Sequence, residues 1–371
     1  MSDLNIKHIF RCAYPDESTH LGKGDIALIL DDNISQIPEG YGLYLISEDN
    51  RMRGINKLRH IPENCVSGSF VYADDSGAVR LLGTSDIPDR TLFLTGLCNS
   101  NCIMCPYSEG YRLQSHLEPP ELIKRYIDLM DPNADYVCIT GGEPTLLREG
   151  FLDIVSQVNR HFHNVVLHIL TNGRTFAYKQ FVNEYRKVRP YKTLLGIPLH
   201  ADNAELHDTI SQSKGSFDQT IRGLDNLYVS DEYIEIRIVT SNLNYKNLPE
   251  LARFIVSRYP FCHHVCLMGM EMMGNAMINR DIVWCSYETI YPYIREATDI
   301  MLSGGVETKL YNYPLCMIEK RYWPLYRKSI TQSKIVFLPD CEGCKNQNEC
   351  GGFFRTTSIM PNIKVTPIKE I

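Results

Sequence analysis

The stretch Thr91-Leu92-Phe93-Leu94-Thr95 is followed, after Gly96-Leu97, by Cys98-Asn99-Ser100-Asn101-Cys102-Ile103-Met104-Cys105. The apolar run predicts a β-strand, and the three thiols after it lie in a short loop. At this spacing the three sulfurs can converge on one soft metal centre, because thiolates bind iron–sulfur clusters and zinc. Three ligands instead of four would leave one iron of a cluster open to a reacting ligand. The loop therefore predicts a reactive cluster, with a structural zinc loop or three unconnected cysteines as the alternatives.

Strand-like and helix-like segments alternate from Thr91 to about Tyr311, which is typical of β/α units around a parallel sheet. The expected strands are residues 91–95, 136–140, 165–170, 193–199, 235–240, 264–268 and 306–310. The expected helices are residues 120–130, 151–162, 178–185, 217–228, 248–258 and 286–302. Pro120 suits a first helical turn, and Ser303-Gly304-Gly305 suits a helix end. The pattern predicts an α/β fold, a partial (β/α)6 barrel.

The segments on either side of this barrel have a different character. Residues 1–88 contain short apolar runs separated by turn signals such as Asp74-Asp75-Ser76-Gly77, which predicts a β-rich accessory module with a hairpin. This module either braces the barrel or grips a peptide or partner. We expect three parts: the module at 1–88, the barrel at 89–311, and a cysteine-rich extension at 312–371.

A second group of cysteines lies in that extension, at Cys316, Cys341, Cys344 and Cys350. Four thiolates are enough to close a metal site completely. Tetrahedral zinc and a [4Fe–4S] cluster both fit this ligand count, and both take thiolates. The chain has thirteen cysteines, but we do not expect a small, secreted protein of the kind that disulfides stabilise. We therefore interpret the clustered cysteines as metal ligands rather than as disulfides.

The spacing of Cys98, Cys102 and Cys105, together with Gly141-Gly142-Glu143-Pro144-Thr145, resembles the radical SAM superfamily. The resemblance implies that the three cysteines hold a [4Fe–4S] cluster whose fourth iron is chelated by S-adenosylmethionine. Cleavage of the sulfonium after one-electron reduction would release a 5′-deoxyadenosyl radical. Met104 stands where the superfamily commonly has an aromatic residue, and it is expected to cover the cluster. Auxiliary clusters recur in the peptide maturases of this superfamily, so the resemblance favours iron–sulfur over zinc at the second cysteine group.

The ends of the expected strands carry the remaining candidate residues, because parallel-barrel chemistry gathers where strands end and loops begin. By resemblance, Gly141, Gly142, Glu143 and Pro144 would bind the amino group of S-adenosylmethionine. The other expected cofactor contacts are Thr171, Asn172, His200 and Arg237. An ordinary turn, a structural histidine and a solvated arginine are the alternatives for these. We expect Glu271 at the mouth of the site, and His207-Asp208 to cap or orient a helix.

A closer resemblance, to the His-Xaa-Ser system radical SAM maturase family HxsC, covers the chain from about Thr91 to its C-terminus. It is carried by Leu195-Gly196-Ile197-Pro198-Leu199, Met268-Gly269-Met270-Glu271-Met272-Met273-Gly274 and Leu338-Pro339-Asp340-Cys341-Glu342-Gly343-Cys344, among other stretches. It implies modification of a ribosomally made peptide or protein with His-Xaa-Ser repeats. It also implies a second radical SAM maturase as partner and an electron donor such as flavodoxin or ferredoxin.

Two other functions remain open from the sequence. One is a radical SAM enzyme that acts on a nucleotide or small molecule in cofactor biosynthesis, and the other is a non-catalytic metal scaffold. Lys and Arg number 38 against 44 Asp and Glu, a net charge of −6, so we expect no nucleic-acid partner. No apolar run approaches the length of a membrane span, and no signal peptide is evident, so we expect a cytoplasmic protein without a membrane partner.

Overall fold

The computed structural model describes residues 26–30, 43–45, 69–73, 79–84, 90–114 and 120–369. The chain divides into two compact units. Unit 1 comprises Met1–Thr95, His116–Ile169 and Tyr185–Thr193, and unit 2 comprises Gly96–Ser115, Leu170–Glu184 and Leu194–Ile371.

An eight-stranded sheet has the hydrogen-bonded order β12-β11-β10-β9-β8-β7-β6-β5, so neighbouring strands follow one another along the chain. The pairs β5–β6, β6–β7, β8–β9, β9–β10, β10–β11 and β11–β12 are parallel. The strands are β5 (Arg90–Phe93), β6 (Tyr136–Thr140), β7 (Val166–Leu170), β8 (Thr193–Pro198), β9 (Tyr233–Val239), β10 (His264–Met268), β11 (Thr308–Tyr311) and β12 (Tyr326–Arg327). The predicted α/β fold with a parallel sheet is confirmed, and β12 is the one strand of this sheet that the sequence did not predict.

Unit 1 contains a second sheet with the order β2-β1-β3-β4, from β1 (Ile26–Leu30), β2 (Leu43–Leu45), β3 (Ser69–Ala73) and β4 (Val79–Thr84). The antiparallel pair β3–β4 confirms the predicted hairpin, whose turn at 74–77 lies outside the described residues. The ring of Phe70 on β3 lies 5.3 Å from that of Tyr126 on α2 (Pro120–Asp128), in edge-to-face contact. Helix α2 packs on α3 (Glu149–His161).

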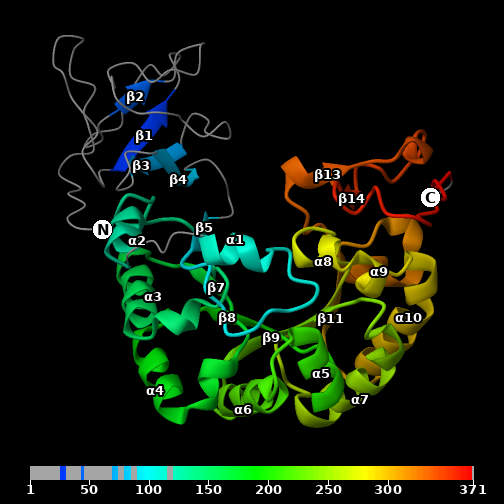
Figure 1. The fold of residues 1–371 in the computed structure, drawn as a ribbon, viewed down its shortest axis with the longest axis horizontal. Helices are drawn as coiled ribbons and strands as arrows, with labels where there is room; N and C mark the ends of the chain where they lie inside the picture. The colour runs from blue at the N-terminus through cyan, green and yellow to red at the C-terminus, as the bar shows by residue number, and fades with distance from the viewer. Residues whose placement is uncertain are drawn as a thin grey trace. The chain divides into compact units, whose positions relative to one another are not determined.

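Unit 2 contains the helices α5 (Ala204–Ser211), α6 (Ser216–Tyr228), α7 (Leu248–Arg258), α8 (Asn275–Ile278), α9 (Arg280–Val283) and α10 (Tyr287–Ser303). The helix α4 (Lys179–Val188) has residues in both units. Strand β9 alternates in character: Ile234, Ile236 and Ile238 are fully buried, while Glu235 and Arg237 lie on the opposite face. Gly304 follows the last residue of α10, as the sequence predicted. Helices α7 and α10 lie side by side (Figure 1).

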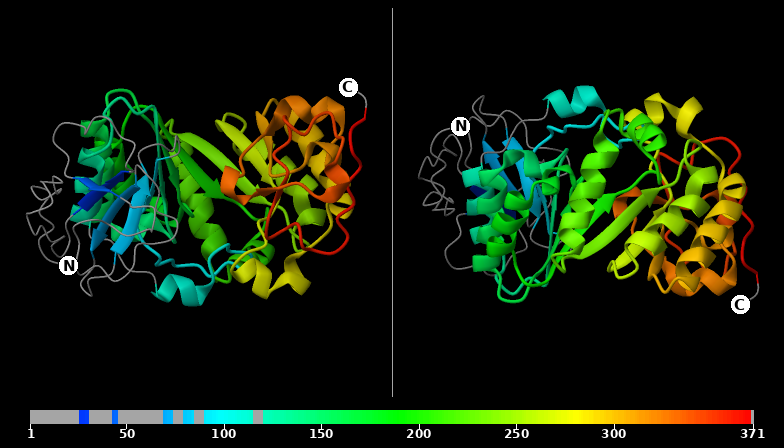
Figure 2. Two further views of the ribbon diagram at one scale, coloured as in Figure 1. Left: turned by 90° about the horizontal axis from the view of Figure 1, so that it is seen from above. Right: turned by 90° about the horizontal axis from the view of Figure 1, so that it is seen from below.

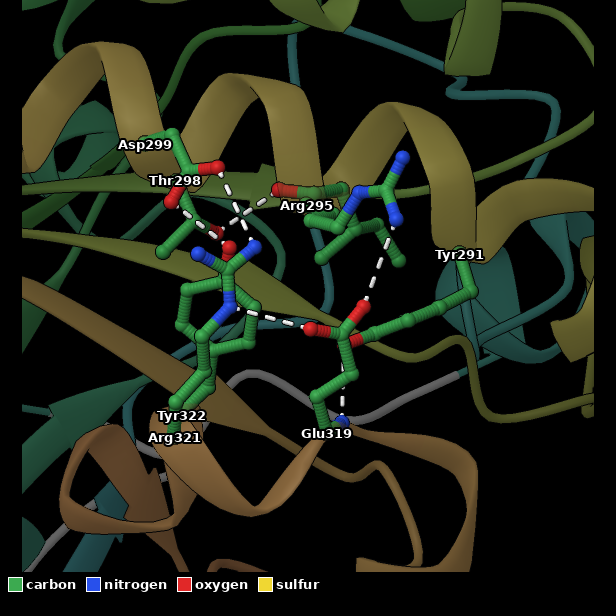
Figure 3. A network of polar contacts seen from close by, with 8 residues as sticks. Tyr291, Arg295, Thr298, Asp299, Glu319, Arg321 and Tyr322 are labelled. Carbon is green, nitrogen blue, oxygen red and sulfur yellow. Dashed lines mark hydrogen bonds and ion pairs between the residues drawn. The ribbon is translucent and has the colours of Figure 1, made fainter.

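A polar network anchors the beginning of the C-terminal extension to α10 (Figure 3). The hydroxyl of Tyr322 donates to Asp299 Oδ1 at 2.6 Å, and the Glu319 N–H donates to the hydroxyl oxygen of Tyr291 at 2.8 Å. Arg321 Nε donates to Glu319 Oε2 at 2.9 Å. Burial is the main cause that raises the pKa of the Tyr322 hydroxyl, and the hydrogen bond to Asp299 raises this pKa further. Two views of the extension, drawn in orange and red, are given in Figure 2.

The extension itself has little regular structure. It consists mainly of short 3-10 helices and one two-stranded sheet, β13 (Ile335–Val336) with β14 (Phe353–Phe354). Its residues are therefore positioned by side-chain contacts and turns more than by long elements. Within the described residues, no helix is long and apolar enough to cross a membrane.

Candidate metal centres

The cysteine loop, residues 98–105, follows β5 and precedes α1 (Glu109–Gln114). The loop turns back on itself, because the Cys105 N–H donates to the Cys102 carbonyl at 3.0 Å and the Ser100 N–H donates to Cys98 Sγ at 3.4 Å. Burial, followed by the charges of Cys105 and Cys98, raises the pKa of Cys102 to about 12. Three thiols that oppose one another's ionisation in this way form a donor set that a cationic metal centre would stabilise. The loop therefore fits a three-thiolate cluster.

The segment Thr171-Asn172-Gly173-Arg174 holds the first half of this loop. Asn172 Nδ2 donates to Asn99 Oδ1 at 2.6 Å, and Arg174 Nη1 donates to the Asn99 carbonyl at 2.5 Å and to Ser100 Oγ at 2.9 Å. Arg174 is itself held by Gln219 Oε1 at 2.7 Å. Sequence reasoning named Thr171 and Asn172 as cofactor contacts or a turn, and it missed the clamp that Arg174 provides. Thr171 is buried and its hydroxyl accepts from the Gly173 N–H.

Two asparagines hold the second half of the loop, and sequence reasoning missed both. Asn275 Nδ2 donates to Asn101 Oδ1 at 2.9 Å and to the Cys102 carbonyl at 3.0 Å. Asn279 Nδ2 donates to the Ile103 carbonyl at 3.1 Å. The preceding Gly274 has φ +57°, and a Cβ there would lie 2.3 Å from the Pro106 carbonyl. Glycine is therefore required where the segment after β10 approaches the loop.

Met104, expected to cover the cluster, packs in an apolar cluster within unit 2. Its neighbours there are Ile210, Met270, Met272, Ala276, Val283 and Met360. Its side chain is 6% exposed. The residue before the third cysteine thus ties the loop to the hydrophobic core, which explains why a long apolar side chain serves at this position.

The Gly141-Gly142-Glu143-Pro144 segment in unit 1 forms a turn against the end of β5. The Gly142 N–H donates to the Thr95 carbonyl at 2.6 Å, and a Cβ on Gly141 would lie 2.5 Å from the same oxygen. Glu143 is fully buried, and its Oε1 accepts from the N–H and the hydroxyl of Thr145 at 3.0 and 2.6 Å. The segment is thus held against Thr95, which stands three residues before Cys98 in the chain. Pro144 is the first residue of the short helix η2 (Pro144–Leu147).

His200 lies after β8 and is almost completely buried. The main-chain N–H of His200 donates to Nδ1 of His207 at 3.3 Å, so His207 carries its proton on Nε2. Burial, then the neighbouring His207, lowers the pKa of His200, and burial lowers the pKa of His207 to about 4. Both rings are therefore neutral at physiological pH, and Nδ1 of His200 is buried without a hydrogen-bond partner among the described residues.

Asp208 caps α6, which confirms the structural role predicted for the His207-Asp208 pair. Its Oδ2 accepts from the Gly215 N–H at 2.6 Å, and its Oδ1 accepts from Ser216 Oγ and the Phe217 N–H, both at 2.8 Å. Burial opposes ionisation, but these hydrogen bonds outweigh it and lower the pKa of Asp208. The carboxylate is engaged as a helix cap and is therefore unsuited to acid–base chemistry.

Arg237 on β9 pairs with the buried Glu235 two residues before it. Glu235, His264 and Cys266 place one ligand atom each within 4.8 Å of one another. Arg237 already supplies a cation to this carboxylate, so the group is better described as a buried ion-pair network than as a cation site. The Arg237 side chain is 20% exposed, so part of it reaches solvent.

Glu271, expected at the mouth of the site, forms an ion pair with Lys334 of the extension at 3.1 Å. Burial is the main cause that raises the pKa of Tyr107, followed by the neighbouring Tyr111 and then by the charge of Glu271. Tyr107 stands two residues after Cys105, so Glu271 lies within electrostatic reach of the cysteine loop.

The four C-terminal cysteines, Cys316, Cys341, Cys344 and Cys350, line one pocket, together with Phe337 and Phe353 among others. Burial raises the pKa of Cys316 to about 11, and the charges of the other three cysteines act in the same direction. Main-chain N–H groups point at these sulfurs: Leu315 and Gly352 donate to Cys350 Sγ, and Ile368 donates to Cys344 Sγ, all at 3.4 Å. Converging thiols with N–H donors around them fit a closed four-thiolate metal site.

Part of this chain is similar to known proteins. Residues 92–255 match the model of the Radical SAM superfamily. The antilisterial bacteriocin subtilosin biosynthesis protein AlbA of Bacillus subtilis is 32% identical over 173 residues, 46% of this chain and 37% of AlbA. The mycofactocin maturase MftC of Mycolicibacterium smegmatis is 32% identical over 171 residues, 45% of this chain and 41% of MftC.

The fold is also similar to that of a solved structure, Streptococcus suis SuiB bound to precursor peptide SuiA. The TM-score is 0.51 at 15% sequence identity, over 67% of this chain and 53% of that chain. At this identity the likeness concerns the fold alone. The chain spans about two fifths of the length of the two curated relatives.

Proposed function

We propose that residues 92–255, which match the model of the Radical SAM superfamily, form a radical SAM domain, and that the chain modifies a ribosomally synthesised peptide or protein. The observation that carries the proposal is the pair of cysteine sets: an open three-thiol loop after β5 and a closed four-thiol pocket in the extension. AlbA, a bacteriocin biosynthesis protein, and MftC, a maturase, support a peptide as the substrate class.

The proposed S-adenosylmethionine contacts follow the residues that the resemblance singles out. Cys98, Cys102 and Cys105 would hold a [4Fe–4S] cluster, and Gly141, Gly142, Glu143 and Pro144 would bind the amino group of S-adenosylmethionine. Further contacts are assigned to Thr171, Asn172, His200 and Arg237. When bound, the cluster and S-adenosylmethionine supply a 5′-deoxyadenosyl radical that abstracts a hydrogen atom from the substrate. Arg174, Asn275 and Asn279 hold the loop in place, and the neutral rings of His200 and His207 add no charge of their own after β8.

The second cysteine set is assigned to an auxiliary [4Fe–4S] cluster rather than to zinc. Four ligands leave no open iron, so this cluster would carry an electron or stabilise the extension rather than bind substrate. The N–H donors to Cys344 and Cys350 suit an iron–sulfur centre, because hydrogen bonds to cluster sulfurs tune its reduction potential.

The substrate is proposed to be a peptide or protein with His-Xaa-Ser repeats. The support is the resemblance of segments such as Met268-Gly269-Met270-Glu271-Met272-Met273-Gly274 to the HxsC family. A second radical SAM maturase and an electron donor such as flavodoxin or ferredoxin complete the proposed system. Cross-linking, epimerisation and oxidation are all compatible with a substrate radical.

The experiment is the mass of a His-Xaa-Ser repeat peptide after co-expression with this chain, alone and with a second maturase of the same system. A Cys98→Ala/Cys102→Ala/Cys105→Ala variant is the matched control. A mass change that requires the three cysteines is the expected result, and its size identifies the reaction. An unchanged peptide, with S-adenosylmethionine still cleaved by the purified chain, would refute this substrate class and favour a nucleotide or small molecule.

A further inference from the structure

Arg112 is a buried cation beside the cysteine loop that the sequence did not point to. It lies on α1 and is only 6% exposed. Its main-chain N–H donates to the Ser108 carbonyl at 3.0 Å. Arginine remains protonated in proteins, so this site always carries a positive charge. A buried charge is retained only where its surroundings compensate for lost hydration.

The guanidinium of Arg112 is directed at the two residues immediately before Cys102. Nη1 donates to the Ser100 carbonyl at 3.0 Å, and Nη2 donates to Asn101 Oδ1. The same Asn101 oxygen accepts from Asn275 Nδ2 at 2.9 Å, and the Asn101 N–H donates to the Ser211 carbonyl at 3.1 Å. Three segments thus fix the position of the cation relative to the loop, so its distance from the sulfurs is set by the fold.

The Arg112 cation is bonded to the cysteine loop itself, at the Ser100 carbonyl and at Asn101, the residue directly before Cys102. A group that favours negative charge on the sulfurs also favours the reduced form of a cluster bound there, because reduction adds one negative charge. The interaction is strong in a buried site, where the effective dielectric constant is low.

We propose that Arg112 acts as a positioning residue that raises the reduction potential of the cluster held by Cys98, Cys102 and Cys105. The proposal rests on the proposed radical SAM function, since it needs a cluster at this loop. It concerns the reduction of the cluster only: one electron enters from an external donor such as a reduced flavodoxin, and no bond in the protein is made or broken. Loss of the charge is expected to make this electron harder to deliver.

The test is a redox titration of the reconstituted full-length chain, followed by the electron paramagnetic resonance signal that changes when S-adenosylmethionine is added. This criterion separates the loop cluster from any auxiliary cluster. In Arg112→Gln, which keeps hydrogen-bond donors but removes the charge, the equilibrium constant for reduction should fall by about tenfold, equivalent to about 59 mV for one electron. Arg112→Lys, which keeps the charge, should remain near the wild-type value.

Arg222→Gln is the matched control, because it removes an exposed cation on α6 that donates to the Asp218 carbonyl of its own helix. An Arg112→Gln chain with full iron content and an unchanged potential would overturn the proposal, as would an equal shift in Arg222→Gln. If Arg112→Gln does not retain iron, Arg112→Lys decides: retention of iron and potential supports the role of the charge, and loss of iron shows that Arg112 is only a clamp. A wild-type chain with no signal that responds to S-adenosylmethionine would instead overturn the proposed function, and this inference with it.

Discussion

The guanidinium of Arg174 donates to the main-chain carbonyl of Asn99 at 2.5 Å, joining the turn after β7 to the residue that follows the first loop cysteine. The same nitrogen reaches the hydroxyl oxygens of Ser100 and Ser213 at 2.9 and 3.0 Å. One side chain thus fixes the position of the cysteine loop against two other segments of unit 2. The shape of the proposed cluster site depends on such contacts as much as on the cysteines.

Replacing Arg174 by Ala should therefore loosen the loop. Hydrogen bonds from a charged donor contribute about 1.5–3 kcal/mol each, so we expect weaker cluster binding and a lower iron content after reconstitution. The measurement is iron and acid-labile sulfide per chain. Arg222→Ala is the control, because Arg222 is exposed and, among the described residues, its side chain donates to the Asp218 carbonyl of its own helix. Equal iron loss in both variants would contradict the role assigned to Arg174.

Replacing Asp208 by Ala should lower the free energy of unfolding by about 1–2 kcal/mol, because α6 loses its N-terminal cap. Hydrogen bonds depress the pKa of Asp208 against the effect of burial, so this contribution is present above its ordinary value of 3.8 and is lost as the pH falls through the lowered pKa. The difference between wild type and variant, measured by urea unfolding, should thus be constant between about pH 5 and pH 7. Asp218→Ala, an exposed carboxylate on the same helix, should change stability little, and an equal loss there would argue against the cap.

His207 should make the stability of the chain sensitive to mild acid. Its folded pKa of about 4 lies below the ordinary 6.5, so the unfolded chain binds a proton first and stability falls as the pH drops from 6.5 towards 4. The expected loss from this residue between pH 6.5 and pH 5 is about 2 kcal/mol, measured by urea unfolding of the metal-free chain. His207→Asn keeps an acceptor for the His200 N–H but does not titrate, so its acid sensitivity should be smaller. An identical pH dependence in the variant would show that His207 is not the sensitive group.

The C-terminal pocket gives a prediction about metal content. Removing Cys344 and Cys350 together should lower the iron content by about four per chain if the pocket holds a [4Fe–4S] cluster. Cys285→Ala serves as the control, because Cys285 lies outside both cysteine groups. Loss of one zinc with unchanged iron would assign the pocket to zinc.

The parallel sheet and most of its helices could be predicted from the sequence, because buried strands and amphipathic helices leave apolar periods. The expected strand at 264–268 coincides with β10, and the expected helix at 248–258 coincides with α7. The short helices α1, α5, α8 and α9 were missed. Elements of four to eight residues span only one or two turns, which is too short to establish a helical period.

The cysteines of both sets could be found from their spacing, but the residues that hold them could not. Asn275 and Cys102 are separated by 173 positions and share a hydrogen bond, and Arg174 and Asn99 are separated by 75. No local pattern marks an asparagine or arginine as the partner of a distant main-chain carbonyl. Gly274 carried the one available signal, since a glycine beside a polar residue at a strand end indicates close approach of another segment.

The most direct test of the account is the formation of 5′-deoxyadenosine from S-adenosylmethionine by the anaerobically reconstituted, chemically reduced chain. The account predicts that wild type forms it and that the Cys98→Ala/Cys102→Ala/Cys105→Ala variant does not. A wild-type chain that carries its full complement of iron, is reduced, and still forms no 5′-deoxyadenosine in the presence of S-adenosylmethionine would contradict it.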